Sequence, residues 1–303
     1  MKTVRKESDV VYPKDTDFAR KARTRQSEWR EKKGYAKDEG KLGQYGNFLD
    51  VKYAKREKVN FLTNNIRYLV TQEIENAKKS KALIGEPRIW NNLLSSQPLC
   101  FNLFGELYFD LNLATTFFQK LFPERIDKIM AIKFEYSPGR KNKKYLNDRS
   151  AFDVFVEYRK GEKRGFIGIE VKYTESLKEE TEAQAKKIFE DPKKNYVEWA
   201  KNSGLFKQNS IEKLKQPPIS QIWRDHLLCI ATKQDYDEGF FVFLYPEKNK
   251  QCKDGVENYM QYLAFDSERQ NCFYPLTLEK SIRTLAKLSN ADWINELKER
   301  YEI

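Results

Sequence analysis

The sequence of 303 residues contains one histidine, His226, and four widely spaced cysteines without a Cys-x-x-Cys pair. A single histidine excludes any catalytic or metal-binding arrangement that needs two, and it disfavours Cys–His and Ser–His catalysis. The spacing of the cysteines favours buried free thiols in a reducing cytoplasm over a zinc site or a disulfide framework. Acid–base and metal chemistry must therefore rest on carboxylates and lysine. The four cysteines are Cys100, Cys229, Cys252 and Cys272.

Long hydrophobic runs are also missing. No segment approaches the roughly 20 apolar residues that a membrane-spanning helix needs, and no amphipathic helix has the strongly basic face that binds an anionic membrane surface. The opening residues, MKTVRKESDVVYPKD, are basic without an apolar core, so we do not expect a secretory signal. These features predict a cytoplasmic protein that does not associate with a membrane.

What the sequence does contain is basic charge and enough apolar residues for a core. Lysine and arginine number 56 against 45 aspartates and glutamates, which gives a net charge of +11. Hydrophobic residues make up 40% of the chain and aromatic residues 14%, which favours a folded protein. A polyanion is the first partner to consider for such a chain.

Hydrophobic periodicity predicts an α/β fold in which helices precede a group of strands. Helical spacing covers about 60–84 and 88–121, and strand patterns follow at 126–136, 150–158 and 164–173. The first 60 residues are polar and interrupted by glycines, which indicates a solvated arm over the core or an arm that contacts DNA.

The rest of the chain predicts a helical insertion and a second group of elements. The insertion is followed by a helix, a buried strand, a weaker strand signal and a helical pair, at 175–216, 220–233, 239–247, 259–265 and 277–301. We therefore expect a basic, mainly helical N-terminal extension packed on the core over 1–94, the core over 95–250, and a C-terminal extension of the same domain over 251–303.

Charged residues interrupt two alternating apolar runs in 152–173, FDVFVEYRKGEKRGFIGIEVKY. Asp153 lies in the first run, and Glu170 and Lys172 lie in the second. Charges inside strands are costly unless they have a purpose. Alternation places all three on one face of a hairpin, because side chains of a strand point alternately to opposite faces.

The turn sets the register of this hairpin. A two-residue loop at Gly161–Glu162 suits a hairpin turn with glycine first and pairs residue 160 with residue 163. The same register sets Asp153 opposite Glu170, with Cβ atoms roughly 5 Å apart. Phe152 is expected on the opposite, apolar face, and Gly168 beside Glu170 is expected to leave room for a substrate.

Two carboxylates held this close repel each other unless a cation lies between them. Magnesium prefers hard oxygen ligands such as carboxylates, and Lys172 lies near enough to contact an attacking water or a phosphate oxygen. The alternative is that these are solvated side chains on the open face of a two-layer sheet, which is the better interpretation of any isolated Glu-x-Lys tripeptide.

An aspartate, a hairpin of this length and a Glu-x-Lys at the end of an apolar strand resemble the PD-(D/E)xK nuclease superfamily, whose members have the restriction-endonuclease-like fold. Here the first acid follows Phe152 where proline is usual. The resemblance implies a core of helix, three strands, helix and strand with a mixed central sheet, over roughly 95–247. It also implies that Asp153 and Glu170 bind Mg²⁺, with Mn²⁺ as a possible substitute, and that Lys172 positions or activates a water.

The resemblance further implies two helical site residues. Many members have a glutamate in the helix before the first core strand, and Glu106 in SSQPLCFNLFGELYFDL is the candidate metal ligand, although it could instead turn outward. Gln221 is the candidate for a polar residue that faces the site from the helix at 220–233, or it is an exposed glutamine. His226 on that helix is expected to be a core or surface histidine without a catalytic role.

A basic run, GRKNKKYLNDR, leads into the strand that contains Asp153. Its position suggests that this run guides a phosphate backbone to the metal, although most charge runs are solvated loops. Binding of this kind weakens steeply with salt. The candidate nucleic-acid-binding residues are Arg140, Lys143, Lys144 and Arg149.

These features together predict a metal-dependent endonuclease that hydrolyses DNA phosphodiester bonds. The helix around Glu106 and the Glu-x-Lys strand look like those of a bacterial restriction-type subgroup, which implies a role in restriction or phage defence, as a homodimer or with a partner protein of a defence system. A nuclease of repair, recombination or transposition is an alternative. A catalytically silent nucleic-acid-binding protein of the same fold is another, and the complete set of Asp153, Glu170 and Lys172 argues against it.

Overall fold

The computed structural model describes residues 12–303 except residues 81, 83 and 178–180. Residues 1–11 of the expected N-terminal extension therefore lie outside the described residues, as do 81 and 83. Residues 178–180 of the expected insertion also lie outside them.

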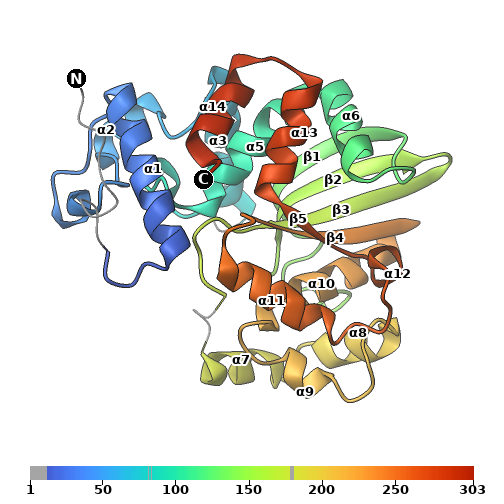
Figure 1. Ribbon diagram of the computed structural model, residues 1–303. Coiled ribbons are helices and arrows are strands. Elements are labelled where there is room, and N and C mark those ends of the chain that lie inside the picture. Colours follow the sequence, from blue (N-terminus) through green and yellow to red (C-terminus); the bar gives the residue numbers. More distant parts are fainter. Residues whose placement is uncertain (1–11, 81, 83, 178–180) are drawn as a thin grey trace.

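The centre of the molecule is a mixed sheet of five strands (Figure 1) in the order β1-β2-β3-β4-β5. The pairs β1–β2 and β2–β3 are antiparallel, whereas β3–β4 and β4–β5 are parallel. The predicted α/β class is confirmed, with three consecutive strands followed by a helix and a strand. The strands are β1 (Lys128–Tyr136), β2 (Phe152–Lys160), β3 (Lys163–Val171), β4 (Glu238–Tyr245) and β5 (Phe273–Thr277).

Strands β2 and β3 form the hairpin in the predicted register. Val154 pairs with Ile169 and Lys160 with Lys163, which is the register that sets Asp153 opposite Glu170. Gly161 holds the first turn position with φ of 55°, a conformation that glycine adopts without the steric cost of a Cβ. The turn chemistry therefore fixes which side chains meet at the other end of the hairpin.

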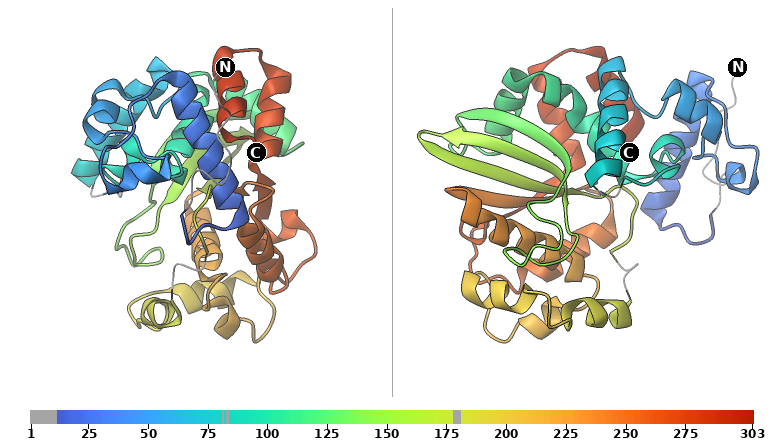
Figure 2. Two further views of the ribbon diagram at one scale, coloured as in Figure 1. Left: turned by 60° about the vertical axis from the view of Figure 1, so that its left-hand side comes forward. Right: turned by 180° about the vertical axis from the view of Figure 1, so that it is seen from behind.

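Helices cover both faces of the sheet (Figures 1 and 2). On one face, α5 (Ser96–Phe109) packs on the first three strands and α6 (Leu111–Leu121) packs on β1. On the other face, α10 (Ser220–Thr232) packs on β4. Because both faces are covered, every residue of β4 after Glu238 is buried, which is typical of a parallel strand at the centre of a sheet.

The hydrophobic core accordingly forms two clusters separated by the sheet. Val154, Val156 and Ile169 belong to the cluster that contains the residues of α5 and α6. Phe155 and Phe166 belong to the cluster on the α10 side. The alternation of β2 and β3 that the sequence shows therefore distributes apolar side chains between two helical layers.

The segment between β3 and α10 is helical, as predicted from its composition. It contains α7 (Glu182–Phe189), α8 (Tyr196–Ser203) and α9 (Ile211–Leu214), which lie beyond α10 on the side away from the sheet (yellow in Figure 2). The rings of Phe189 and Trp223 lie 5.1 Å apart, so apolar contacts hold the insertion against α10.

The N-terminal residues form a helical group that packs against the end of the chain. The group comprises α1 (Asp17–Lys33), a 3-10 turn at Lys41–Tyr45, α2 (Val51–Glu57), α3 (Asn64–Ser80) and α4 (Arg88–Asn91). Helix α1 ends at Gly34, whose φ is 69°. Its residues Phe18, Ala22 and Trp29 join the main hydrophobic cluster, so this part of the chain is not the solvated arm that its polarity suggested.

The C-terminal residues complete both layers. The elements are α11 (Lys250–Met260), α12 (Glu268–Asn271), α13 (Leu278–Leu288) and α14 (Asp292–Tyr301), and a 3-10 turn at Lys233–Asp235 follows α10. The helical pair is confirmed, but the strand expected near 259–265 is wrong. Those residues hold the end of α11 and a loop, and the fifth strand begins at Phe273. The strand expectation failed because, among the described residues, this short apolar stretch pairs only through the isolated bridge of Leu263 with Phe206 and joins no strand of the sheet.

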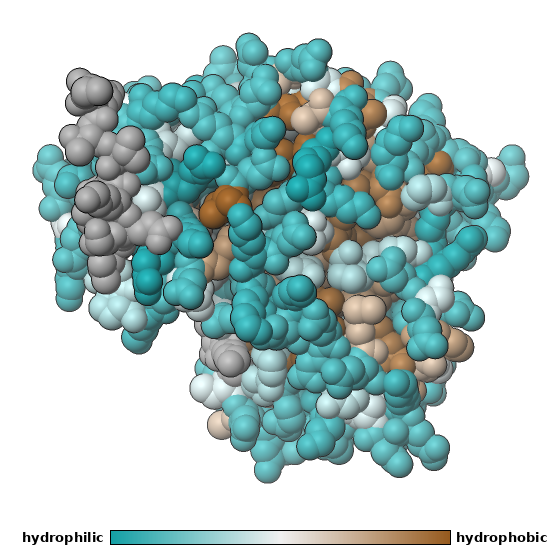
Figure 3. Space-filling model, viewed as in Figure 1, coloured by the Kyte–Doolittle hydropathy of each residue, from teal (hydrophilic) through white to brown (hydrophobic). Residues whose placement is uncertain are grey.

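The surface seen in Figure 3 is largely hydrophilic, and hydrophobic residues appear mainly over the region of α13 and the β5 edge of the sheet. The described residues include no helix long and apolar enough to cross a membrane. All four cysteines are free, and Cys100, Cys229 and Cys252 are buried, as the sequence predicted.

Candidate active site

Asp153 and Glu170 lie side by side where the ladder between β2 and β3 ends. The last paired residues on this side are Val154 and Ile169. Beyond them, the backbone N–H of Val171 donates a hydrogen bond to Asp153 Oδ2 over 2.8 Å. The carboxylate of Asp153 thus replaces a backbone acceptor, which fixes its position next to Glu170.

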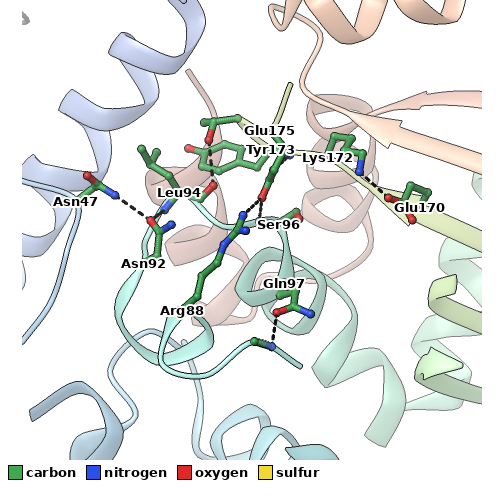
Figure 4. A network of polar contacts seen from close by, with 12 residues as sticks. Asn47, Arg88, Asn92, Leu94, Ser96, Gln97, Glu170, Lys172, Tyr173 and Glu175 are labelled. Atoms are coloured by element: carbon green, nitrogen blue, oxygen red, sulfur yellow. Dashed lines mark hydrogen bonds and ion pairs between the residues drawn. The ribbon is translucent and has the colours of Figure 1, made fainter. Parts of the chain in front are cut away.

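Lys172 and Gln221 both contact Glu170. Lys172 Nζ donates to Glu170 Oε1 over 2.6 Å (Figure 4), and Gln221 Nε2 of α10 donates to the same oxygen over 3.0 Å. Glu170 is 7% exposed and Lys172 is 8% exposed, so each charge needs the other to offset its loss of hydration. The hairpin and α10 therefore bring Asp153, Glu170, Lys172 and Gln221 together.

The electrostatics of this cluster are dominated by burial and like charge. Burial raises the pKa of Asp153 well above its ordinary value, and the carboxylates of Glu170 and Glu135 raise it further. Burial by itself would lower the pKa of Lys172, but the charges of Glu170 and Asp153 outweigh it and raise that pKa above its usual value. Lys172 is therefore a cation at neutral pH, suited to stabilising negative charge and unsuited to accepting a proton.

Glu175 anchors the chain immediately after this cluster (Figure 4). Its Oε1 accepts hydrogen bonds from Arg88 Nη2 over 2.8 Å and from the backbone N–H of Ser96 over 2.7 Å. Its Oε2 accepts from the backbone N–H of Tyr173 over 3.0 Å. Because Ser96 begins α5, a carboxylate there also interacts favourably with the helix dipole. Glu175 thereby fixes Lys172 relative to α5.

The expected open space beside Gly168 is absent. A Cβ at Gly168 would lie 2.3 Å from the ring of Phe152, and Phe152 packs with Phe155 and Phe166 in the α10-side cluster. Phe152 therefore lies on the face opposite to the one that alternation predicted. It is the first residue of β2 and pairs with Tyr136, next to the left-handed backbone of Glu135, where the regular alternation is interrupted. Gly168 makes room for an aromatic ring, and not for a substrate.

A cavity of about 540 Å³ opens beside Glu170. Glu135, Gln221 and Asp225 line it on the side of the sheet and α10. Basic side chains also line it: Arg140, Arg149, Lys187, Lys194 and Arg224. A second cavity of about 470 Å³ lies next to Lys172 and shares Lys187, Gln221 and Arg224 with the first. Glu170 therefore faces a hollow in which these five basic side chains lie among acidic ones that include Asp148 and Asp191.

Glu106 does not join the site. It is half-buried on α5, and its carboxylate accepts hydrogen bonds from Thr63 Oγ1 and from Asn65 Nδ2, the latter over 3.2 Å. The side chain that α5 sends toward the site is Gln97, which donates to Glu135 Oε1 over 2.7 Å. Gln97 and Glu106 are nine positions apart, roughly 2.5 turns of helix, and so lie on opposite sides of α5.

The sequence analysis did not identify two acids that line the cavity. Glu135 on β1 and Asp225 on α10 both line the cavity with Glu170. Burial, and then the charge of Glu170, raise the pKa of Glu135 to about 7 and that of Asp225 well above its ordinary value. Asp225 follows Gln221 by four positions, the spacing of neighbours on one helical face. This spacing could have predicted from the sequence that Asp225 lies beside Gln221.

The expected basic run divides into two groups. Arg140 and Arg149 line the cavity, and Arg140 Nη2 also donates to the backbone oxygen of Glu135 over 3.0 Å. Lys144 forms an ion pair with Asp235, and Lys143 is exposed outside the cavity lining. The structure thus places two of the four candidates at the site, while Lys187, Lys194 and Arg224 are further basic residues that the sequence reasoning did not single out.

His226 is a core residue, as expected. It is fully buried, its Nδ1 lies 2.8 Å from the hydroxyl oxygen of Tyr259, and burial lowers its pKa to about 3. A neutral, buried imidazole on this side of α10 takes no part in the cavity.

The donors at the site suit a divalent cation. Asp153 and Glu170 offer the hard carboxylate oxygens that Mg²⁺ and Mn²⁺ prefer, and Asp225 Oδ2 is buried in the cavity wall without a hydrogen-bond partner among the described residues. In the described part of the chain, no three His, Cys, Asp or Glu side chains converge closely enough to form a complete ligand set. Lys172 and Gln221 instead hold Glu170, so cation binding requires the carboxylates to turn toward one another.

Comparison with known proteins agrees with this geometry. The family model of the PD-(D/E)XK nuclease superfamily matches residues 13–302, which include the described sheet and both helical layers. Searches of curated proteins and of solved structures gave no match. The match extends over almost the whole chain, through the hairpin that holds Asp153, Glu170 and Lys172, and the chain therefore belongs to the PD-(D/E)XK nuclease superfamily.

Proposed function

We propose that this protein is an endonuclease that hydrolyses phosphodiester bonds in DNA with Mg²⁺, or with Mn²⁺ as a substitute, in restriction or phage defence. The observation that carries the proposal is the cluster of Asp153, Glu170 and Lys172 beside a cavity that five basic side chains help to line. The role in defence rests on the resemblance of the α5 stretch and the Glu-x-Lys strand to restriction-type members of the superfamily.

The basic residues of the cavity bind the phosphate backbone in this proposal. Arg140 and Arg149 approach from the loop before β2, and Lys187 and Lys194 approach from the insertion. A DNA strand that lies between the loop before β2 and the insertion passes over Glu170. Positive charge on both sides offsets the repulsion between the phosphates and the acidic cluster, which otherwise disfavours substrate binding.

The acidic residues and Lys172 then act on one phosphodiester. Asp153 and Glu170 hold the cation, which when bound polarises the phosphoryl oxygens and increases the acidity of a coordinated water. Lys172 is protonated and held in place by Glu170, so it orients the attacking water and stabilises the charge that develops on the phosphate. Gln221 keeps Glu170 directed into the cavity through its hydrogen bond.

The test is cleavage of supercoiled and linear DNA by purified wild-type protein and by Asp153→Asn, each with Mg²⁺, with Mn²⁺ and with a chelator. Removing one carboxylate of the metal site should lower the cleavage rate by roughly a thousandfold or more. Asp254→Asn is the matched control, because Asp254 is an exposed residue of α11 paired with Lys250 and the substitution changes the net charge equally.

Metal-dependent cutting by wild type and by Asp254→Asn, but not by Asp153→Asn, supports the proposal. Equal cutting by Asp153→Asn would remove this residue from the mechanism. If no protein cuts but all of them shift DNA in a salt-sensitive manner, the nuclease proposal is wrong and a nucleic-acid-binding role replaces it.

A further inference from the structure

We propose that Glu135 supplies the third carboxylate of the metal site, the role that the sequence resemblance implied for Glu106. The inference rests on the proposed metal-dependent function and goes beyond it by assigning a residue from a different element. Glu135 lies on β1, whereas Asp153 lies on β2 and Glu170 on β3.

Strand register places the three acids in one row across the sheet. The pairs Phe134–Val154 and Tyr136–Phe152 set Glu135 opposite Asp153, and the β2–β3 register sets Asp153 opposite Glu170. Neighbouring strands lie roughly 4.8 Å apart, so Glu135 and Glu170 stand one strand spacing to either side of Asp153. The longer acids occupy the outer strands and the shorter acid the central one, so a cation that draws the three carboxylates toward one another would lie above Asp153.

The backbone at Glu135 is strained in a way that favours this role. Its φ is 48°, and among the described residues it is the one non-glycine residue of a strand with such a conformation. The alternation of β1 shifts here. Residues three apart in a regular strand point to opposite faces, but Lys133 Nζ lies 4.9 Å from the ring centre of Tyr136. Left-handed backbone at a non-glycine residue is energetically unfavourable and is concentrated at functional sites.

The side chain of Glu135 is held in the position that the role requires. Gln97 of α5 donates to its Oε1 over 2.7 Å, and the same cavity wall contains Glu135 and Glu170. A supporting hydrogen bond to a carboxylate is the usual arrangement around metal ligands. Glu106 also accepts hydrogen bonds, but from Thr63 and Asn65 on the other side of α5 and away from this cavity.

The test is direct measurement of Mn²⁺ binding by isothermal titration calorimetry, without DNA, on wild-type protein, Glu135→Gln, Glu106→Gln and Asp191→Asn. We expect Glu135→Gln to weaken Mn²⁺ binding roughly tenfold or more, while Glu106→Gln leaves it unchanged. Asp191→Asn controls for charge, because Asp191 also lines the cavity, and it should leave Mn²⁺ binding close to that of wild type.

The outcomes separate this inference from the proposed function. If wild type binds Mn²⁺ and Glu135→Gln binds it as tightly, or if Asp191→Asn weakens binding equally, the inference is wrong and the proposed function stands. If wild type binds no Mn²⁺, both fall. Circular dichroism reports whether Glu135→Gln is folded. If it is not, Gln97→Leu replaces it, since this variant releases Glu135 without changing the charge, and unchanged Mn²⁺ binding by folded Gln97→Leu overturns the inference.

Discussion

Two regions of the molecule bury charge in opposite ways. At the junction of the N-terminal helices with α14, Arg300 is fully buried and its guanidinium donates to Gln26 Oε1 over 2.9 Å, to Asn60 O over 2.7 Å and to Asn60 Oδ1 over 2.5 Å. Its guanidinium carbon also lies 4.3 Å from the ring centre of Trp29. At the candidate active site, the charges of Glu170 and Glu135 act on the buried Asp153, and Lys172 donates a hydrogen bond to Glu170.

The difference separates a structural role from a functional one. Each nitrogen of the Arg300 guanidinium has an acceptor, so this buried charge contributes to stability by joining residues far apart in sequence. The acids of the candidate site repel one another, and in the proposed function a bound cation relieves the repulsion. A buried charge with its partners in place indicates structure, and a buried group of like charges indicates a ligand.

The largest expected effect is on stability and follows from removing the buried charge of Arg300, whose hydrogen-bond partners are all in place. Arg300→Met deletes the guanidinium and leaves buried oxygens of Gln26 and Asn60 without donors, which should lower the free energy of unfolding by roughly 3 kcal/mol or more. Chemical denaturation measures the loss, and Arg25→Met is the control, since Arg25 is an exposed residue of α1. DNA cleavage by the folded fraction at low temperature should be retained. A loss of cleavage without a loss of stability would contradict the comparison.

At the acidic cluster, in contrast, the buried charge of Glu135 should lower the stability of the metal-free protein. The pKa of Glu135 is raised from 4.5 to about 7, by burial first and then by Glu170. Between these two values the folded state binds more protons than the unfolded state, so stability falls as pH rises through this window and the loss from Glu135 is complete above it. This group contributes a loss of roughly 1 to 3 kcal/mol.

Thermal unfolding in chelator across pH 4 to 8 measures this effect. Glu135→Gln should remove part of the loss and be more stable than wild type near pH 8, and Mn²⁺ should restore wild-type stability there. The prediction fails if metal-free wild type becomes more stable between pH 5 and 7 while Glu135→Gln follows the same curve.

The smallest expected effect is on DNA binding. It again contrasts a basic side chain that faces the cavity with one that already has an acidic partner. Arg149 lines the cavity, whereas Lys144 is paired with Asp235. Arg149→Gln should weaken DNA binding roughly tenfold in 0.1 M salt and reduce the slope of log K against log salt by about 0.9, because one phosphate contact is lost. Lys144→Gln should bind as wild type does. Equal slopes for all three proteins would show that Arg149 makes no phosphate contact.

Much of the fold could be predicted because the relevant signals are local. Alternation located β2 and β3, a two-residue turn with Gly161 set their register, and an apolar run marked β4. The same local signals assembled Asp153, Glu170 and Lys172 on one hairpin. The fifth strand was misplaced, since 259–265 and Phe273–Thr277 are both short and apolar and only pairing with β4 distinguishes them.

The sequence by itself determined the hairpin and its row of charged residues, Asp153, Glu170 and Lys172. Turn geometry and side-chain alternation suffice for this because they act over a few neighbouring residues. Only the tertiary structure decided which acids outside the hairpin join that row. Glu106 is close to the expected motif position, but the direction in which α5 packs turns it away and presents Gln97. Glu135 lies beside Asp153 because β1 pairs with β2, a long-range contact whose register depends on the whole sheet and the helices that cover it.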